Sequence, residues 1–130
     1  MRRERVSDDI YVFTSDLYAQ VTASAIVTRE GIVVIDTLPF PVETREMIEY
    51  LRALGQGPVK YLVNTHWHGD HTGGNENLAN TGAVIVAHDN VRVRMSSEQF
   101  IAALNSRTPA SPPPSPTWVS RAVRRASPRN

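Results

Sequence analysis

The hydrophobic positions of the first hundred residues form short strand-like runs, separated by stretches with helical periodicity. The β-prone runs lie at residues 10–13, 22–28, 31–35, 59–63 and 83–87. Residues 32–35 are apolar without alternation, which is typical of a strand that is covered on both faces of its sheet. Residues 29–31 connect the second run to the third as a compact turn, so we expect a β-hairpin there.

Helical periodicity is clearest at residues 41–54. Pro41 suits the first turn of a helix and Gly55 is a typical stop. Four apolar side chains of this stretch fall on one helical face: Met47, Ile48, Leu51 and Leu54. We expect a short helix at residues 76–80 and another helix at residues 97–104. Strands that alternate with helices predict an α/β fold with much parallel pairing.

The C-terminal part of the chain differs in composition from the rest. Residues 99–130 hold five arginines and no acidic residue, and residues 109–130 hold six of the nine prolines. Such a stretch cannot bury enough apolar area to offset the entropy that ordering would cost. We therefore predict a partial domain at residues 1–107 and a disordered tail, rich in Pro, Ser and Arg, at residues 108–130.

Three explanations of this tail remain open. It is a solvated terminus, an arginine-rich segment that binds an anionic partner, or a segment translated from a non-native reading frame of the gene. The chain has thirteen arginines and one lysine, as GC-rich codons would give, and this favours the third explanation.

Composition also excludes several classes of protein. The chain has no cysteine, so it can form neither a disulfide nor a thiolate metal site. It contains no run of 18 apolar residues, and no apolar run follows the basic residues near Met1. We therefore expect a cytoplasmic protein without a membrane partner.

A cluster of histidines carries the strongest chemical signal in the sequence. Three of the four histidines, His66, His68 and His71, fall within six positions that also include Asp70. In an extended chain His66 and His68 point to the same side, so both imidazoles can reach one ion. Gly69 allows a tight bend that brings Asp70 and His71 toward a second ion. Imidazole and carboxylate ligands suit zinc, with iron or manganese as alternatives, whereas a chance cluster of solvated histidines would bind nothing.

Residues 66–71 read His-Trp-His-Gly-Asp-His, and they match the H-x-H-x-D-H motif of the metallo-β-lactamase superfamily, which this sequence resembles. The match extends through residues 72–75, and residues 31–37 and 84–88 resemble the strands on either side of the motif. The resemblance covers about residues 8–112. It implies a truncated N-terminal half of an αββα sandwich, with one mixed sheet and its helices.

The resemblance also implies a role for each motif residue. His66 and His68 match ligands of a first metal, while Asp70 and His71 match ligands of a second metal. Asp70 is in addition the expected catalytic residue, because it would accept a hydrogen bond from the attacking water and aim it. Asp36 matches a position that supports the ligand loop from behind, although it could equally be a strand-end cap.

Two further residues near the motif are expected to be structural. His88 resembles a structural histidine after its strand rather than a ligand. Trp67, between two of the histidines, is expected to point away from them and pack.

The function implied by the resemblance is that of a zinc-dependent hydrolase with two zinc ions in a complete site. Metal-activated water would attack an ester, amide, thioester or phosphoester of a small-molecule substrate. The family pattern requires later ligands, but no histidine follows His88 and no aspartate follows Asp89. The alternative is therefore an inactive truncated fragment with an incomplete metal site.

The implied single sheet also affects which partners are expected. Its inner face would be bare, so we expect self-association or the binding of a complementary second half. We do not expect nucleic acid as a partner, because Trp118 is the only aromatic residue near the arginines of the tail.

Overall fold

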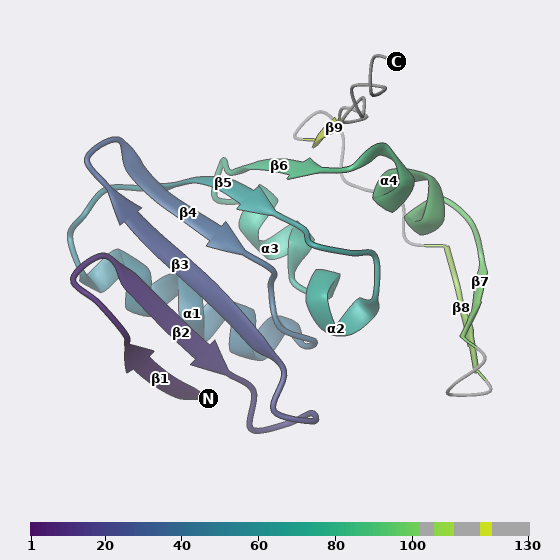
Figure 1. Ribbon diagram of the computed structural model, residues 1–130, viewed down its shortest axis with the longest axis horizontal. Helices are drawn as coiled ribbons and strands as arrows, with labels where there is room; N and C mark the ends of the chain where they lie inside the picture. Colours follow the sequence, from purple (N-terminus) through teal and green to yellow (C-terminus); the bar gives the residue numbers. More distant parts are fainter. Residues whose placement is uncertain (102–105, 111–117, 121–130) are drawn as a thin grey trace, which may run out of the picture.

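The computed structural model describes residues 1–101, 106–110 and 118–120, and these form a mixed α/β structure (Figure 1). The strands are β1 (Arg2–Arg5), β2 (Ile10–Thr14), β3 (Thr22–Thr28), β4 (Gly31–Ile35), β5 (Val59–Val63), β6 (Val84–Ala87), β7 (Gln99–Ile101), β8 (Ser106–Thr108) and β9 (Trp118–Ser120). The helices are α1 (Pro41–Ala53), α2 (Gly69–Thr72), α3 (Asn75–Ala79) and α4 (Asp89–Met95).

Seven of the strands form one sheet in the order β1-β2-β3-β4-β5-β6-β9, and β7 and β8 form a separate pair. Strands β1 to β4 pair antiparallel, whereas β4, β5, β6 and β9 run parallel to one another. The predicted hairpin is therefore confirmed as β3 and β4. Gly31 at its turn has a φ of +125°, and a Cβ there would lie 2.8 Å from the carbonyl oxygen of Pro58. Only glycine suits this position.

One face of the sheet is covered by helices, with α1 and α3 lying behind the strands in Figure 1. The helix predicted from Pro41 is confirmed as α1, and its buried Met47, Ile48 and Leu51 belong to one core cluster with Phe13 and Leu62 of the sheet. The alternation of side chains along each strand sends every second residue into this core. The predicted short helix is confirmed as α3, one residue earlier than expected.

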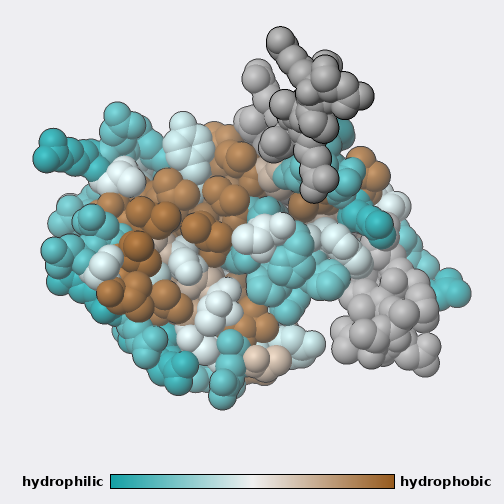
Figure 2. Space-filling view, in the orientation of Figure 1, coloured by the Kyte–Doolittle hydropathy of each residue, from teal (hydrophilic) through white to brown (hydrophobic). Residues whose placement is uncertain are grey.

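The opposite face of the five central strands carries two rows of cross-strand neighbours. The register places Ile10, Ile26, Val33, Tyr61 and Val84 in one row, and Val12, Ser24, Ile35, Val63 and Val86 in the other. None of these ten residues is charged and none is fully buried. Figure 2 shows the resulting apolar surface across the middle of the sheet. We call these two rows the open face.

The helix predicted at residues 97–104 is wrong at its described positions. Residues 99–101 form β7, which pairs with β8, and residues 102–105 lie outside the described residues. The periodicity rested on only three apolar residues, and the sequence Gln-Phe-Ile is also β-prone. A helix that the pattern did not predict, α4, lies just before this segment and ends at Met95.

The predicted tail is described at only a few positions. Thr108 belongs to β8, and residues 118–120 form β9 beside β6, so at these positions the chain is a strand instead of the disordered segment that was expected. Residues 111–117 and 121–130 lie outside the described residues, and the division at residue 107 stays a prediction. No helix in the described part of the chain is long and apolar enough to cross a membrane.

Candidate metal centre

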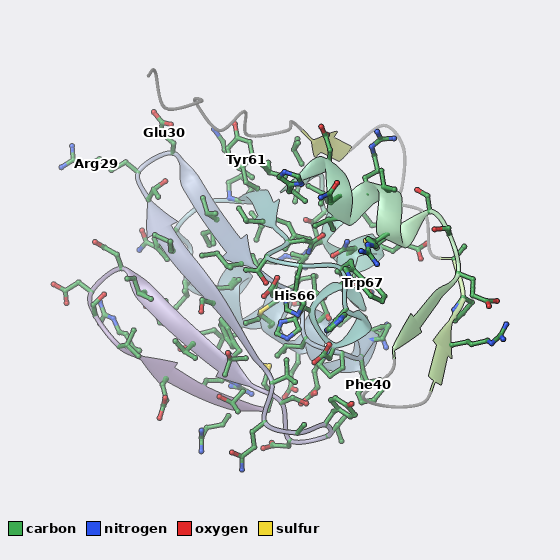
Figure 3. All side chains as sticks on the ribbon, turned by 45° about the vertical axis from the view of Figure 1, so that its right-hand side comes forward. Arg29, Glu30, Phe40, Tyr61, His66 and Trp67 are labelled. Carbon is green, nitrogen blue, oxygen red and sulfur yellow. The ribbon has the colours of Figure 1, made fainter. Side chains whose placement is uncertain are left out.

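The histidine cluster lies at the carboxyl end of the parallel strands, where α/β folds commonly place their sites. The loop from Asn64 to Gly74 follows β5, and Asp36 follows the neighbouring strand β4. Figure 3 shows His66 and Trp67 at this end of the sheet, opposite to the hairpin turn that carries Arg29 and Glu30. Two segments that are far apart in the sequence therefore meet because their strands are parallel neighbours.

Asp36 is the centre of a hydrogen-bond network behind the histidines. Its side chain is buried, and its carboxylate accepts hydrogen bonds from the Thr65 backbone N–H (2.9 Å) and the Thr65 hydroxyl (2.8 Å). Its Oδ2 also lies 3.0 Å from Nδ1 of His71. The backbone of Asp36 has a φ of +62°, a left-handed conformation that aspartate tolerates better than most residues. These bonds hold both the turn after β4 and the ring of His71.

Thr65 extends this network to a second histidine. Its hydroxyl donates to Asp36 and lies 2.8 Å from Nδ1 of His66, so it can accept the proton of that nitrogen. Asp36 therefore orients His71 directly and His66 through Thr65. In both rings the hydrogen-bond network engages Nδ1 and leaves Nε2 as the nitrogen that can bind a metal ion. Local sequence carries no signal for Thr65, because its partner lies 29 positions away.

The structure brings all four motif residues and Asp36 together in two overlapping groups. Ligand atoms of His66, His68 and Asp70 lie within 4.8 Å of one another, and so do those of Asp36, His66 and His71. The ring centroids of His66 and His71 are 4.1 Å apart, and those of His66 and His68 are 5.0 Å apart. Nε2 of His71 faces Oδ2 of Asp70 at 3.4 Å. His66 is common to both groups.

The local electrostatics favour the neutral form of His66. Burial lowers the pKa of this imidazole below its usual 6.5, and the neighbouring His71 and His68 lower it further. The carboxylates of Asp36 and Asp70 oppose that shift. Because only a neutral imidazole binds a metal, the lowered pKa of His66 favours the ligand form near neutral pH.

The two remaining residues of interest have structural contacts. Nδ1 of His88 accepts a hydrogen bond from the Asn90 N–H (3.1 Å) and caps α4, which is the structural role predicted for it. Trp67 packs against the small cluster of Ala87, Val91 and Met95, and its ring also meets the His68 ring edge-on at a centroid distance of 4.7 Å. The predicted packing of Trp67 is confirmed, but the expectation that its ring points away from both histidines is wrong, because the ring contacts that of His68.

Comparisons with known proteins find matches in sequence and in fold. A family model for the metallo-beta-lactamase superfamily matches residues 18–125. A metallo-beta-lactamase from Pontibacter korlensis is 26% identical, with a TM-score of 0.64, over 88% of this chain and 52% of that chain. A HARLDQ-motif mutant of a metallo-beta-lactamase from Cronobacter sakazakii is 21% identical, with a TM-score of 0.69, over 91% of this chain and 46% of that chain.

A third solved structure is a metallo-beta-lactamase from Pseudomonas aeruginosa in a mono-zinc form. It is 21% identical, with a TM-score of 0.61, over 86% of this chain and 49% of that chain. At this identity, the second and third structures show the fold alone. The chain spans about half the length of the solved structures that it matches.

Proposed function

Because the chain belongs to the metallo-β-lactamase superfamily, as the match over residues 18–125 shows, we propose that it is a metal-dependent hydrolase or the metal-binding half of one. The observation that supports this most strongly is that His66, His68 and Asp70 bring their ligand atoms close enough together to hold one ion. We propose zinc as the ion, because imidazole and carboxylate ligands without thiolate suit zinc, with iron and manganese as competitors.

The donor set is suited to an ion for two reasons. The donor atoms of His66, His68 and Asp70 lie within 4.8 Å of one another, close enough to share one partner. The Nδ1 atoms of His66 and His71 are engaged by Thr65 and Asp36, and such outer hydrogen bonds are typical of metal-binding histidines. A bound divalent ion supplies Lewis acidity and lowers the pKa of a coordinated water.

Each residue of the chain then has a distinct proposed task. His66 and His68 would hold a first ion through imidazole nitrogen, with Asp70 within reach of the same ion, and Asp70 and His71 would supply ligands to a second ion. Asp70, whose side chain is part-exposed, also accepts a hydrogen bond from the attacking water and orients it toward the substrate. Asp36 keeps the proton of His71 on Nδ1, so that Nε2, which faces Asp70, is the nitrogen that can bind an ion.

A second candidate is a metal-binding chain without catalytic activity. The two groups share His66, and the Asp36 oxygens already accept three hydrogen bonds. The described residues thus offer one group of three ligands that share His66 with the other group, and no separate complete set of ligands for a second ion. Full activity of a two-ion site would therefore require ligands from a further segment or partner.

Metal uptake and hydrolysis, measured together on the 130-residue chain, separate these candidates. Metal-free protein is titrated with Zn²⁺, and the loaded chain is tested on a nitrophenyl ester, a β-lactam, a thioester and a phosphodiester. Saturable uptake with hydrolysis above a zinc-only blank supports the hydrolase, and uptake without hydrolysis supports the second candidate.

The matched variants are His68→Gln, inside the cluster, and His88→Gln, outside it. We expect His68→Gln to lose uptake and His88→Gln to retain it. Equal uptake by both variants would refute the proposed site.

A further inference from the structure

The loop that carries the four motif residues is closed by a buried pair of amides. Asn64 and Asn75 lie eleven positions apart, and their side chains exchange two hydrogen bonds. Nδ2 of Asn64 donates to Oδ1 of Asn75 at 3.0 Å, and Nδ2 of Asn75 donates to Oδ1 of Asn64 at 2.8 Å. Both residues are buried, with exposed fractions of 3% and 4%. All four motif residues lie between them.

We propose that this amide pair is a positioning device for the metal centre: it fixes the two ends of the loop so that the imidazoles and the carboxylate converge. The proposal rests on the function proposed above, because it assigns the pair a role in metal binding. Neither asparagine is itself a ligand, and each acts through the loop that it holds.

The pair joins two elements that are anchored in the fold. Asn64 directly follows β5, and its backbone N–H donates to the Val86 carbonyl of β6 (3.1 Å), which continues the parallel sheet. Asn75 begins α3, whose Leu78 and Ala79 are part of the main core. The amide pair therefore links the sheet to a packed helix. The loop between the two asparagines cannot shift as a unit without breaking the hydrogen bonds of the pair.

A second set of hydrogen bonds holds the end of the loop next to Asn75. The Thr37 hydroxyl lies 2.8 Å from the Gly74 N–H, which donates to it, and 3.2 Å from the His71 carbonyl oxygen. The Thr44 hydroxyl in turn donates to the Thr37 carbonyl (2.6 Å). A Cβ on Gly74 would lie 2.0 Å from that Thr44 hydroxyl, so this end of the loop has no space to relax. If Asn75 is displaced, the residues that carry the metal-ligand atoms must therefore move instead.

The chemistry of the pair explains why amides are suited to this place. Each side chain supplies the donor and the acceptor that the other one needs, so neither leaves a buried polar group unpaired. The pair is neutral, so it adds no carboxylate that would compete with Asp70 for a cation. Two leucines would fill a similar volume but would not fix the mutual orientation of the two loop ends.

The variants that test the proposal are Asn75→Ala, the double change Asn64→Leu with Asn75→Leu, and the control Leu51→Ala. Leu51 is fully buried in α1 and lies outside the loop, so its truncation reports the effect of a loss of stability that leaves the amide pair in place. The double leucine variant removes both amides and leaves no unpaired partner, which preserves stability better than a single truncation does.

The probe is Co²⁺ alone, followed by its visible absorption spectrum and by competition for its affinity. We expect both asparagine variants to bind Co²⁺ about 10-fold more weakly or worse, with a changed spectrum, because residues that orient ligands typically have effects of this size. We expect Leu51→Ala to retain the wild-type spectrum and affinity. A double leucine variant that binds Co²⁺ with wild-type affinity and spectrum would overturn the proposal.

Hydrogen exchange of the metal-free chain tests the pair independently of metal binding. In the asparagine variants, protection should fall at the amides of His71, Thr72 and Gly73, which are hydrogen-bonded within the loop, and persist in β4 and β5. Unchanged protection in the loop would overturn the proposal. If the wild-type chain binds no Co²⁺ while the loop loses protection as expected, the proposed function fails and the positioning of the loop by the pair stands.

Discussion

Replacement of Asp36 by asparagine is the sharpest perturbation of the network behind the histidines. The change keeps the shape of the side chain, and asparagine tolerates the left-handed φ of +62° at this position. It removes the charge and turns one acceptor oxygen into a donor. In one orientation, the new NH₂ group faces the Thr65 backbone N–H, which also donates.

In the other orientation, the NH₂ group faces the Thr65 hydroxyl and Nδ1 of His71. Both of these partners can become acceptors, but His71 then carries its proton on Nε2, the nitrogen that faces Asp70. Neither orientation preserves the network. The first orientation loses the buried hydrogen bond from the Thr65 N–H. The second orientation loses the tautomer of His71 in which Nε2 is unprotonated and can bind a metal.

The expected magnitude follows from the burial of Asp36. A hydrogen bond to a charged group contributes about 1.5–3 kcal/mol, and Asp36 is 5% exposed, so solvent screens it little. We expect Asp36→Asn to lower the free energy of unfolding of the metal-free chain by about 2–3 kcal/mol. We expect it to weaken Zn²⁺ binding about 10- to 100-fold.

Urea unfolding of the metal-free chain and competition with a chromophoric zinc chelator measure the two effects separately. Thr28→Ala is a matched control, because it removes a side chain that hydrogen-bonds to the Gly31 carbonyl of the hairpin, at the other end of the sheet. It should reduce stability without a change in zinc affinity. If Asp36→Asn unfolds at the wild-type urea concentration and binds Zn²⁺ with wild-type affinity, the role assigned to Asp36 is refuted.

Three further predictions concern the loop, the effect of pH and the open face. A Cβ at Gly74 would collide with a buried threonine hydroxyl, whereas nothing lies within 4 Å of one at Gly69, so thermal melts should show Gly74→Ala strongly destabilised and Gly69→Ala nearly unchanged. Because the pKa of His66 is lowered in the folded chain, the unfolded chain binds a proton at this imidazole more readily as the pH falls. Urea unfolding should therefore show that wild type loses more stability than His66→Gln as the pH falls from 7.5 to 5.5. Equal losses of stability in the two proteins would contradict this prediction. We expect the uncharged open face to promote self-association, so sedimentation should show the double variant Ile26→Lys, Val33→Glu, at paired positions of β3 and β4, shifted toward monomer relative to wild type.

Local chemistry allowed much of the fold to be predicted from the sequence. The turn at residues 29–31 and the periodicity after Pro41 are properties of neighbouring residues, and both elements are confirmed. The resemblance carried by residues 66–71 is confirmed by the family match. The helix predicted at residues 97–104 was wrong because three apolar residues cannot distinguish a short helix from a β-prone run.

The network behind the histidines was only partly predictable. Asp36 was singled out, with support of the loop and a strand-end cap left as alternatives, and the contacts of its carboxylate are to Thr65 and His71 of the loop. Thr65 and the pair Asn64–Asn75 gave no signal of their own, because their roles depend on contacts across the sheet and across the loop. Such contacts follow from the parallel pairing of β4 and β5, and not from local sequence.

X-ray absorption at the zinc edge, on the 130-residue chain loaded with one equivalent of Zn²⁺, tests most directly whether the cluster binds a metal. Convergence of His66, His68 and Asp70 predicts two imidazole nitrogens at about 2.0–2.1 Å from zinc, with oxygen in the remaining positions. In His66→Gln the imidazole signal should fall to one ring or vanish. A spectrum with oxygen ligands alone, or an imidazole signal that His66→Gln leaves unchanged, would contradict the assignment of this loop as a metal centre.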